Sequence, residues 1–363
     1  MSEYILILVW LAVAGMISTQ IPKQKIVVGD KIEYRYKMWW AVVIMLPIIY
    51  WVGTRDYVGD TYAYTFSFQE IPEKFGELPT YVDSITKDKG FYTLSAIIKV
   101  FISSDVTIYF MVLAIIQGLI LAKLYRTYSI NYMTSIFLFV ISTDYISWMY
   151  NGIRQFTAVT ITLLAFKWIL KKNYMRAIII ILCASLIHKS ALILIPFIFI
   201  CQGKAWNKKT LFFILLIMLV VTGIERFTGI LDTFLAETQY KNVVSDWQSF
   251  GDNGTNIIRV LVYSVPTVLA LIGRKRIERE NNQIINYCVN MSLISAGFYI
   301  LSIFTSGIFI GRIPIYISIY SYILLPWEIK KLFEKRSAII VNIVMIVAYL
   351  IFYCYSMRLW GLF

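Results

Sequence analysis

The sequence contains a dozen apolar runs of about membrane-spanning length, and this feature limits the possible fold more than any other. A helix needs about 20 mostly apolar residues to cross the hydrocarbon core of a bilayer. The runs that reach or approach this length are residues 4–21, 38–53, 105–122, 132–149, 155–171, 174–187, 190–203, 210–225, 257–273, 285–305, 312–327 and 338–357. The pattern predicts an all-α polytopic membrane protein with about twelve transmembrane helices, forming one transmembrane domain over residues 1–363.

The composition favours a bilayer over water as the solvent. Hydrophobic residues make up 59% of the chain and charged residues 15%, whereas an ordinary soluble domain is about 45–50% apolar and about 25% charged. The net charge of +13 would suggest nucleic-acid binding in a soluble protein. Here, however, the basic residues lie in short clusters between apolar runs, as they do in membrane proteins. We therefore expect membrane lipid, and no nucleic acid, as a partner.

The basic residues gather on one set of loops. These loops and helix ends hold 22 of the 34 lysines and arginines but only 6 of the 21 acidic residues. Because short basic loops stay in the cytoplasm, the count predicts a multi-pass protein of the cytoplasmic (inner) membrane with both chain ends outside. Two long outer segments follow, residues 54–104 and 225–256. Within the first, the short apolar stretch 89–103 predicts an interfacial or re-entrant helix.

Polar residues at the outer helix ends are the candidate functional residues, because charge near membrane depth is costly. Arg55 and Asp60 follow the second run, and Asn151, Arg154 and Gln155 stand at the start of the fifth. An arginine at a helix N-terminus suits an anion such as a phosphate. The alternative explanation is helix capping, with the arginine extending to lipid head groups.

His188 and Lys189 stand at another outer helix junction. His188 is the only histidine in the chain, and the apolar runs on either side of it are shorter than a full span. Two short helices meeting there predict a turn below the outer surface, which membrane proteins tolerate around a cavity or inside protein. A histidine in such a turn can accept a proton from a hydroxyl group near neutral pH, although a lone histidine is more often structural.

Arg312 begins the eleventh apolar run and joins Arg55 and Arg154 as a third candidate arginine on the outer face. Its presence favours an anion pocket shared with Arg55 and Arg154. The sequence contains no Walker motif, no G-x-S-x-G and no H-E-x-x-H, which are the motifs of nucleotide, serine-hydrolase and zinc sites. Its acidic residues are dispersed, so we expect no metal site and no cofactor.

Several segments resemble the EpsG family, whose members are Wzy-type polymerases of bacterial exopolysaccharide, capsule and O-antigen. The segments are R-x(4)-D-x(3)-Y (Arg55, Asp60 and Tyr64), KGFYTLSAIIK (89–99), NGIRQFTAVTI (151–161), IHKSALILIP (187–196) and GRIPIY (311–316). The resemblance covers most of the chain. Its most specific parts are the N-x-I-R-Q and I-H-K-S-A-L pieces.

This resemblance implies a metal-independent glycosyltransferase with a GT-C-like architecture and an active site facing the outside or periplasm. Such a polymerase transfers a glycan chain from undecaprenyl diphosphate to the non-reducing end of another lipid-linked repeat unit. The implied partners are the undecaprenyl-diphosphate-linked oligosaccharide, a chain-length regulator and a flippase. His188, or Asp60 as second choice, would be the catalytic base, and Arg154 would neutralise the leaving diphosphate.

The remaining outer polar residues would then bind substrate: Arg55, Tyr64, Asn151, Gln155, Lys189 and Arg312. Two other functions compete with polymerisation. A lipid-linked oligosaccharide flippase or transporter also has polar residues within its spans, but transporters often show paired broken helices in both halves, and here only the pair around His188 is shortened. An O-antigen ligase-like glycosyltransferase would share the chemistry and differ in its acceptor.

Overall fold

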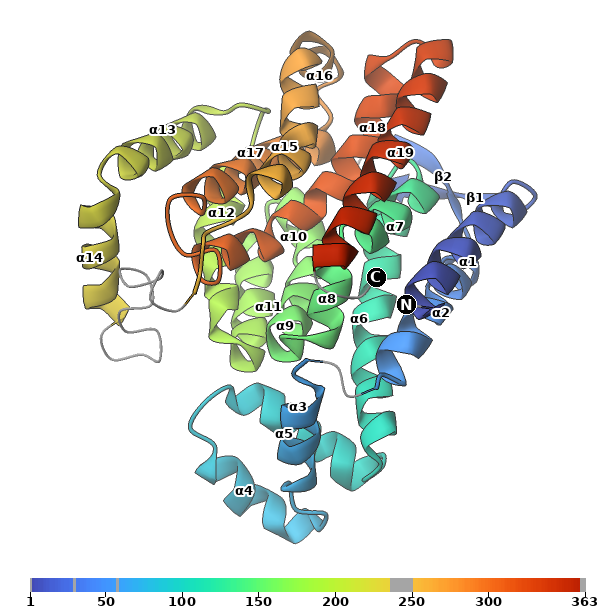
Figure 1. The fold of residues 1–363 in the computed structure, drawn as a ribbon. Helices are drawn as coiled ribbons and strands as arrows, with labels where there is room; N and C mark the ends of the chain where they lie inside the picture. The colour runs from blue at the N-terminus through green and yellow to red at the C-terminus, as the bar shows by residue number, and fades with distance from the viewer. Residues whose placement is uncertain (1, 29–30, 57–58, 236–250, 360–363) are drawn as a thin grey trace. The chain divides into compact units, whose positions relative to one another are not determined.

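The computed structural model describes residues 2–28, 31–56, 59–235 and 251–359 (Figure 1). Within these residues the chain forms nineteen α-helices and one β-hairpin. It divides into two compact units, Met1–Ile195 with Leu350–Phe363, and Pro196–Tyr349. The single transmembrane domain predicted over residues 1–363 stays a prediction.

The first unit contains most of the N-terminal helices and the hairpin. Its elements are α1 (Ser2–Ser18), β1 (Lys23–Val28), β2 (Lys31–Tyr36), α2 (Met38–Gly53), α3 (Thr61–Gln69), η1 (Phe75–Glu77), α4 (Leu78–Ser84), α5 (Lys89–Phe101), α6 (Val106–Tyr128), α7 (Tyr132–Ile141), α8 (Asp144–Tyr150), α9 (Ile153–Leu163), α10 (Phe166–Leu170), α11 (Tyr174–Ile187) and η2 (Lys189–Ile193). The long helix α6 packs along α2, and α9 packs against both α6 and α11 (Figure 1).

A small helical lobe stands where the sequence predicted the first long outer segment. It consists of α3, η1, α4 and α5 and lies at the N-terminal end of α6 (Figure 1). The buried Lys99 closes the lobe, because its Nζ donates hydrogen bonds to the carbonyl oxygens of Phe68 (3.1 Å) and Gln69 (2.7 Å) at the end of α3. Phe68 also stacks on Tyr109 of α6 at 4.2 Å between ring centroids. The lobe is therefore an ordered part of the unit.

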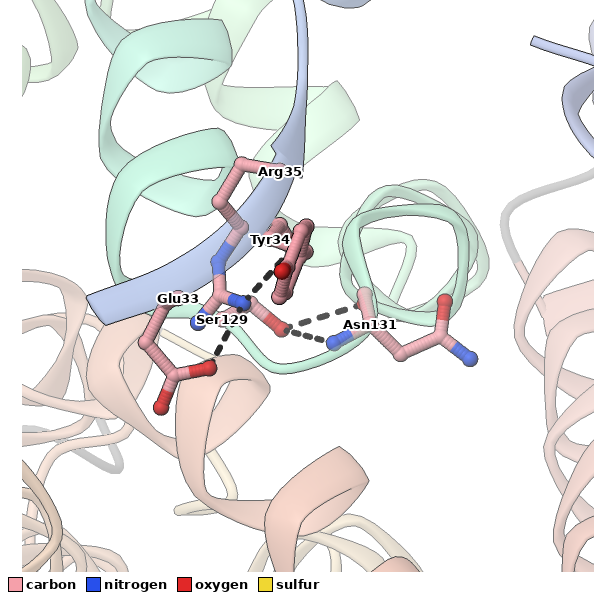
Figure 2. A network of polar contacts seen from close by, with 5 residues as sticks. All are labelled: Glu33, Tyr34, Arg35, Ser129 and Asn131. Atoms are coloured by element: carbon pink, nitrogen blue, oxygen red, sulfur yellow. Dashed lines mark hydrogen bonds and ion pairs between the residues drawn. The ribbon is translucent and has the colours of Figure 1, made fainter. Parts of the chain in front are cut away.

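The antiparallel hairpin lies at the other end of α6. Arg126, in the last turn of α6, donates from Nε to the Tyr36 carbonyl oxygen at 2.8 Å. Figure 2 shows β2 beside the turn between α6 and α7, with Arg35 bonded to Glu33 Oε2 (3.2 Å) and to the Tyr34 carbonyl oxygen (3.0 Å). This hairpin is not among the elements predicted from the sequence, which treats the segment as a basic loop.

The second unit is built around α17. Its elements are the C-terminal part of α12 (Leu194–Ile200), α13 (Lys208–Thr222), α14 (Ile224–Leu235), α15 (Ile257–Ile272), α16 (Arg274–Glu280), α17 (Gln283–Leu301), η4 (Ile310–Tyr316), η5 (Ser318–Tyr320), α18 (Ser321–Leu332) and most of α19 (Lys335–Leu359). The buried Asn290 of α17 accepts from Trp206 N and donates to the carbonyl oxygens of Cys201 and Lys204. A buried amide with its partners satisfied fixes the neighbouring turn.

The structure confirms a helical membrane protein, but not the number of spans. Among the described residues, four helices are long and apolar enough to cross a membrane, or six if each of two bent pairs is one span. Those pairs are α13 with α14, bent by 99°, and α15 with α16, bent by 70°. Five further apolar helices are shorter, including α2 and α11, whose bounds match the predicted runs.

Several predicted spans are interrupted, and in two of them the sequence supplies the reason. The run 132–149 divides into α7 and α8 at Thr143, whose φ is 62°. Hydroxyl and carboxylate side chains in a row offer the backbone alternatives to helical hydrogen bonds, and Ser142, Thr143 and Asp144 supply such a row. The run 312–327 starts as 3₁₀ turns around Pro314, because proline lacks the amide hydrogen that an α-helix needs.

The second predicted outer segment is only partly described. Its beginning is the amphipathic helix α14, and its end, residues 251–256, leads into α15. The aromatic residues Tyr240, Trp247 and Phe250, which the sequence places in this segment, lie outside the described residues.

Candidate functional site

The candidate site lies in the first unit, where α5 and α9 begin and α11 ends. At this point Gly90 meets the last turn of α11, and a methyl group on Gly90 would lie 2.7 Å from the carbonyl carbon and oxygen of Leu186. Only glycine leaves room for that approach. The contact brings Asp88, which precedes α5, close enough to His188 for their charges to interact.

Asp88 and Arg154 form the central ion pair of the site. Arg154 Nη1 donates to Asp88 Oδ2 at 2.9 Å, and the two side chains are 27% and 3% exposed. The backbone of Asp88 is left-handed, with φ 51°, a conformation that aspartate tolerates better than most residues do. Because the carboxylate is nearly buried, the pair holds the Arg154 guanidinium in one position while leaving part of it open to a ligand.

Aromatic side chains surround the Arg154 guanidinium. Its central carbon lies 5.8 Å from the ring centroids of both Tyr64 and Tyr92, within range of a cation–π interaction. Tyr64 is buried and packs edge-on against Phe91 of α5. Burial raises the pKa of Tyr64, and Arg154 offsets part of that rise. The Tyr64 hydroxyl group is therefore neutral, and its ring lines one side of the site around Arg154.

His188 occupies the turn between α11 and η2. Its Nδ1 lies 2.6 Å from Ser190 Oγ and 3.4 Å from Ser190 N. Burial lowers the pKa of His188, and Arg154 and Lys87 lower it further, while Asp88 acts in the opposite direction. The net shift is below the ordinary value, so the imidazole is neutral at neutral pH. A neutral imidazole can accept a proton.

Asp60 and Asn151 hold two loops together. Asp60 N donates to Asn151 Oδ1 at 3.0 Å, and Gly152 N donates to Asp60 Oδ2 at 3.1 Å. Gly59, with φ 56°, lies so close that a side chain there would overlap the Asn151 amide. The reciprocal bonds fix the start of α9, two residues before Arg154.

Arg55 connects the end of α2 to the end of α8. It donates from Nε to the Val52 carbonyl oxygen (2.8 Å) and from Nη1 to the Tyr150 carbonyl oxygen (3.0 Å). Its guanidinium lies over the rings of Phe110 and Tyr150. Burial lowers the pKa of Arg55 to about 10, so the side chain stays charged at neutral pH. These contacts give it a structural task, and its predicted role in anion binding is untested.

The other predicted site residues are more dispersed. Gln155 is half-buried in the first turn of α9, and Lys189 is exposed at the start of η2. Arg312 is exposed on η4, which belongs to the second unit. The structure thus brings together Arg154, His188 and Tyr64, while the pocket predicted to include Arg312 stays a prediction.

Sequence reasoning missed four residues of this site: Lys87, Asp88, Gly90 and Tyr92. Asp88 directly precedes the KGFYTLSAIIK segment (89–99) that resembles the EpsG family, and an aspartate just before a helix is a familiar N-terminal signal. Its partner Arg154, however, lies 66 residues further along the chain. No local pattern connects two such residues.

The described part of the chain contains no group of three histidine, cysteine, aspartate or glutamate side chains able to hold a metal ion. The predicted independence from metals stays a prediction.

Fold and site together define a helical membrane protein with a preorganised arginine, carboxylate and histidine at the ends of its helices. The chain belongs to the EpsG family, whose sequence model matches residues 38–360. This is a family of Wzy-type polysaccharide polymerases, so the chain is a membrane glycosyltransferase of the polymerase type. No curated protein and no solved structure matches it.

Proposed function

We propose that this protein transfers a growing glycan chain from undecaprenyl diphosphate to the non-reducing end of another lipid-linked repeat unit, on the outer face of the bacterial cytoplasmic membrane. The observation that carries the proposal is the Arg154–Asp88 ion pair beside His188, because it puts a fixed cation and a neutral base in one small region. Twelve membrane crossings and a GT-C-like architecture belong to the same proposal.

In the proposed reaction His188 removes the proton from the acceptor hydroxyl group. The acceptor oxygen forms a bond to the anomeric carbon of the donor sugar, and the bond from that carbon to the diphosphate oxygen breaks. The electron pair leaves with undecaprenyl diphosphate, whose negative charge Arg154 stabilises. A preorganised donor of this kind acts on charge that develops in the transition state.

The base role requires one particular tautomer of His188. If Nδ1–H donates to Ser190 Oγ, the lone pair of Nε2 is available for the acceptor proton. The 2.6 Å distance between Nδ1 and Ser190 Oγ fits a hydrogen bond in either direction. The tautomer that the base role requires gives up the longer bond, 3.4 Å, that Ser190 N donates to Nδ1.

Other predicted residues keep supporting roles in the proposal. Asp60 is the second candidate for the base, since it is exposed beside the start of α9. Arg55, Asn151, Gln155, Lys189 and Tyr64 would bind or shape the site for substrate. Arg312 would contact an anionic part of the substrate from the second unit. A chain-length regulator and a flippase are proposed partners.

The test is polymer formation by purified protein in lipid with a synthetic lipid-linked repeat unit, in the presence and absence of EDTA. We expect activity to survive EDTA. Arg154→Lys should lose about 100- to 1,000-fold in rate, because lysine keeps the charge but not the planar fork. His188→Ala should lose about 100- to 10,000-fold. Both variants should reach the membrane at normal levels.

Three outcomes would contradict the proposal in different ways. Transport of the lipid-linked unit without polymer would indicate a flippase. Transfer to a different acceptor would indicate a ligase. Normal polymerisation by His188→Ala would remove the base assignment and make Asp60 the leading candidate.

A further inference from the structure

Asp252 is a buried carboxylate that joins two loops of the second unit. It lies just before α15, and three of its four hydrogen-bond partners follow α17. Each of its oxygens accepts two hydrogen bonds. Oδ1 accepts from Gly254 N (2.9 Å) and Gly307 N (3.1 Å), and Oδ2 accepts from Ser306 Oγ (2.7 Å) and Ile308 N (2.9 Å). We call this arrangement the Asp252 clasp.

Glycines allow the two loops of the clasp to touch. Gly254 has φ 71°, and a side chain there would lie 2.8 Å from the Ser302 carbonyl oxygen. A methyl group on Gly307 would lie 2.8 Å from the carbonyl carbon of Gly254, and one on Gly311 would lie 2.7 Å from Thr255 Oγ1. The absence of side chains at these positions therefore lets the two loops lie in direct contact.

The clasp continues directly into the turn that carries Arg312. Ser306 Oγ donates to Asp252 and accepts from Phe309 N at 2.9 Å. The Ser306 carbonyl oxygen accepts from Ile310 N at 2.9 Å. These bonds set the course of the backbone into η4, where Arg312 is the third residue and is exposed.

The carboxylate is suited to a permanent clasp. Burial alone would raise the pKa of Asp252, but the hydrogen bonds donated by Ile308, Ser306, Gly254 and Gly307 together hold it below the ordinary value. The group therefore stays ionised, and accepts all four bonds, at neutral and mildly acidic pH.

We propose that Asp252 is the positioning residue for Arg312, fixing the turn so that the guanidinium is presented to the diphosphate-bearing end of the lipid-linked substrate. This inference rests on the proposed function. Asp252 lies sixty residues before Arg312 in the chain, and the clasp connects the two. A group that stabilises charge contributes most when its position is set in advance, and the clasp sets the position of the turn that carries Arg312.

The sharpest variant is Asp252→Asn. It keeps the size of the side chain but replaces one carboxylate oxygen by an NH₂ group. This group is a donor and faces two other donors, so the two hydrogen bonds accepted by that oxygen are lost. We expect polymerisation to fall by about 10- to 100-fold, mainly in kcat, since misplacing a catalytic group by about 1 Å can cost that much. Hydrogen exchange should become faster at the amides of residues 305–312 and stay unchanged in α17.

Asp105→Asn is the matched control. Asp105 also accepts two backbone amides, from Thr107 and Ile108, but both bonds go to the same oxygen. Asparagine can replace aspartate in that role at a helix N-cap. Its activity and hydrogen exchange should therefore equal those of the unchanged protein.

A double variant tests whether Asp252 acts through Arg312. If it does, Asp252→Asn combined with Arg312→Gln should be no less active than Arg312→Gln alone. If the rate losses of the two single variants multiply in the double variant, Asp252 has a structural effect separate from Arg312, and the inference is overturned. Should Asp252→Asn fail to accumulate, Ser306→Ala removes one bond of the clasp and should give a smaller loss of the same kind.

The inference and the proposed function fail in different ways. A normal rate with Asp252→Asn and Ser306→Ala, in a protein that polymerises its substrate, overturns the inference alone. Full activity of Arg312→Gln would also overturn the inference and leave the proposed function standing. Absence of polymer with the unchanged protein would overturn the proposed function, and with it the role given to Asp252, even if hydrogen exchange showed that the clasp exists.

Discussion

At the residue scale, the charged neighbours of His188 determine the pH at which it can act as a base. Burial lowers its pKa most, Lys87 lowers it, and Asp88 raises it. A base works only while it is unprotonated, so activity should fall in acid as His188 gains its proton. This fall is the acid limb of the pH–rate profile. Removing the positive charge of Lys87 should move the acid limb to higher pH, and removing the negative charge of Asp88 should move it to lower pH.

The measurement is the pH dependence of polymerisation for Lys87→Met and Asp88→Asn. Lys74→Met is the control, because Lys74 is an exposed lysine of the same lobe and should leave the limb where it is. Asp88→Asn will also lower the overall rate, since it breaks the ion pair with Arg154, but the midpoint of the limb can still be read. A limb that stays in place in both variants would mean that His188 is not the base.

The same residues show what a single sequence can predict. Arg154 and His188 could be found because each interrupts an apolar run at a helix end. Asp88 could not, since its importance depends on Arg154, far along the chain, and on the approach that Gly90 permits. Asp60 and Asn151 were found as candidate site residues, but their bonds to each other's loops only became visible in the structure.

At the element scale, the junction of α5 with α11 depends on the missing side chain of Gly90. A methyl group there would meet the Leu186 backbone at 2.7 Å, and backbone cannot move aside as a flexible side chain can. We expect Gly90→Ala to destabilise the protein by about 1–3 kcal/mol and to reduce polymerisation, because Asp88 would move away from His188.

Gly76→Ala is the matched control for this variant. Gly76 lies in η1 of the same lobe, and a methyl group there would meet nothing within 4 Å. Thermal unfolding in detergent and the polymerisation rate should both stay unchanged. If Gly90→Ala behaves in the same way as Gly76→Ala, the close approach of α5 to α11 does not hold the site together.

The helix α18 contains an unusual buried acid. Glu328 is fully buried, and among the described residues neither of its carboxyl oxygens has a hydrogen-bond partner. Burying a carboxyl group without partners costs free energy whether it is charged or neutral. Glu328→Met, which is similar in volume, should therefore leave the melting temperature unchanged or raise it, whereas the exposed Glu334→Met should have little effect. A clear loss of stability with Glu328→Met would reveal a partner for the carboxyl group.

Helical elements were predicted well where the apolar pattern is unbroken, and less well elsewhere. The bounds of α2 and α11 follow directly from their runs. The break at Thr143 was missed because the polar row Ser142–Asp144 is short and lies between two strongly apolar segments. The hairpin was missed because its basic residues, among them Lys31 and Arg35, were interpreted only as a topology signal, although they alternate with apolar and aromatic side chains.

At the scale of the whole molecule, α6 connects the two ends of the first unit. Its 23 residues span about 35 Å at 1.5 Å per residue, which is enough to cross a bilayer. The lobe lies at its N-terminal end and the basic hairpin at its C-terminal end. The distribution of basic residues therefore predicts that the lobe, with Arg154 and His188 beside it, faces the outside while the hairpin faces the cytoplasm.

This orientation can be tested separately in each unit by labelling single cysteines in a cysteine-free background. Thr80→Cys reports on the lobe of the first unit, and Lys275→Cys reports on α16 of the second unit; both positions are exposed. A membrane-impermeant thiol reagent should label position 80 in intact cells and position 275 only after permeabilisation. Labelling of position 275 alone in intact cells would reverse the topology and place the candidate site in the cytoplasm, where the proposed transfer on the outer face could not occur. Labelling of both positions would show that the charge count holds for the first unit and fails for the second, and Arg312 could then no longer be assigned to the outer face.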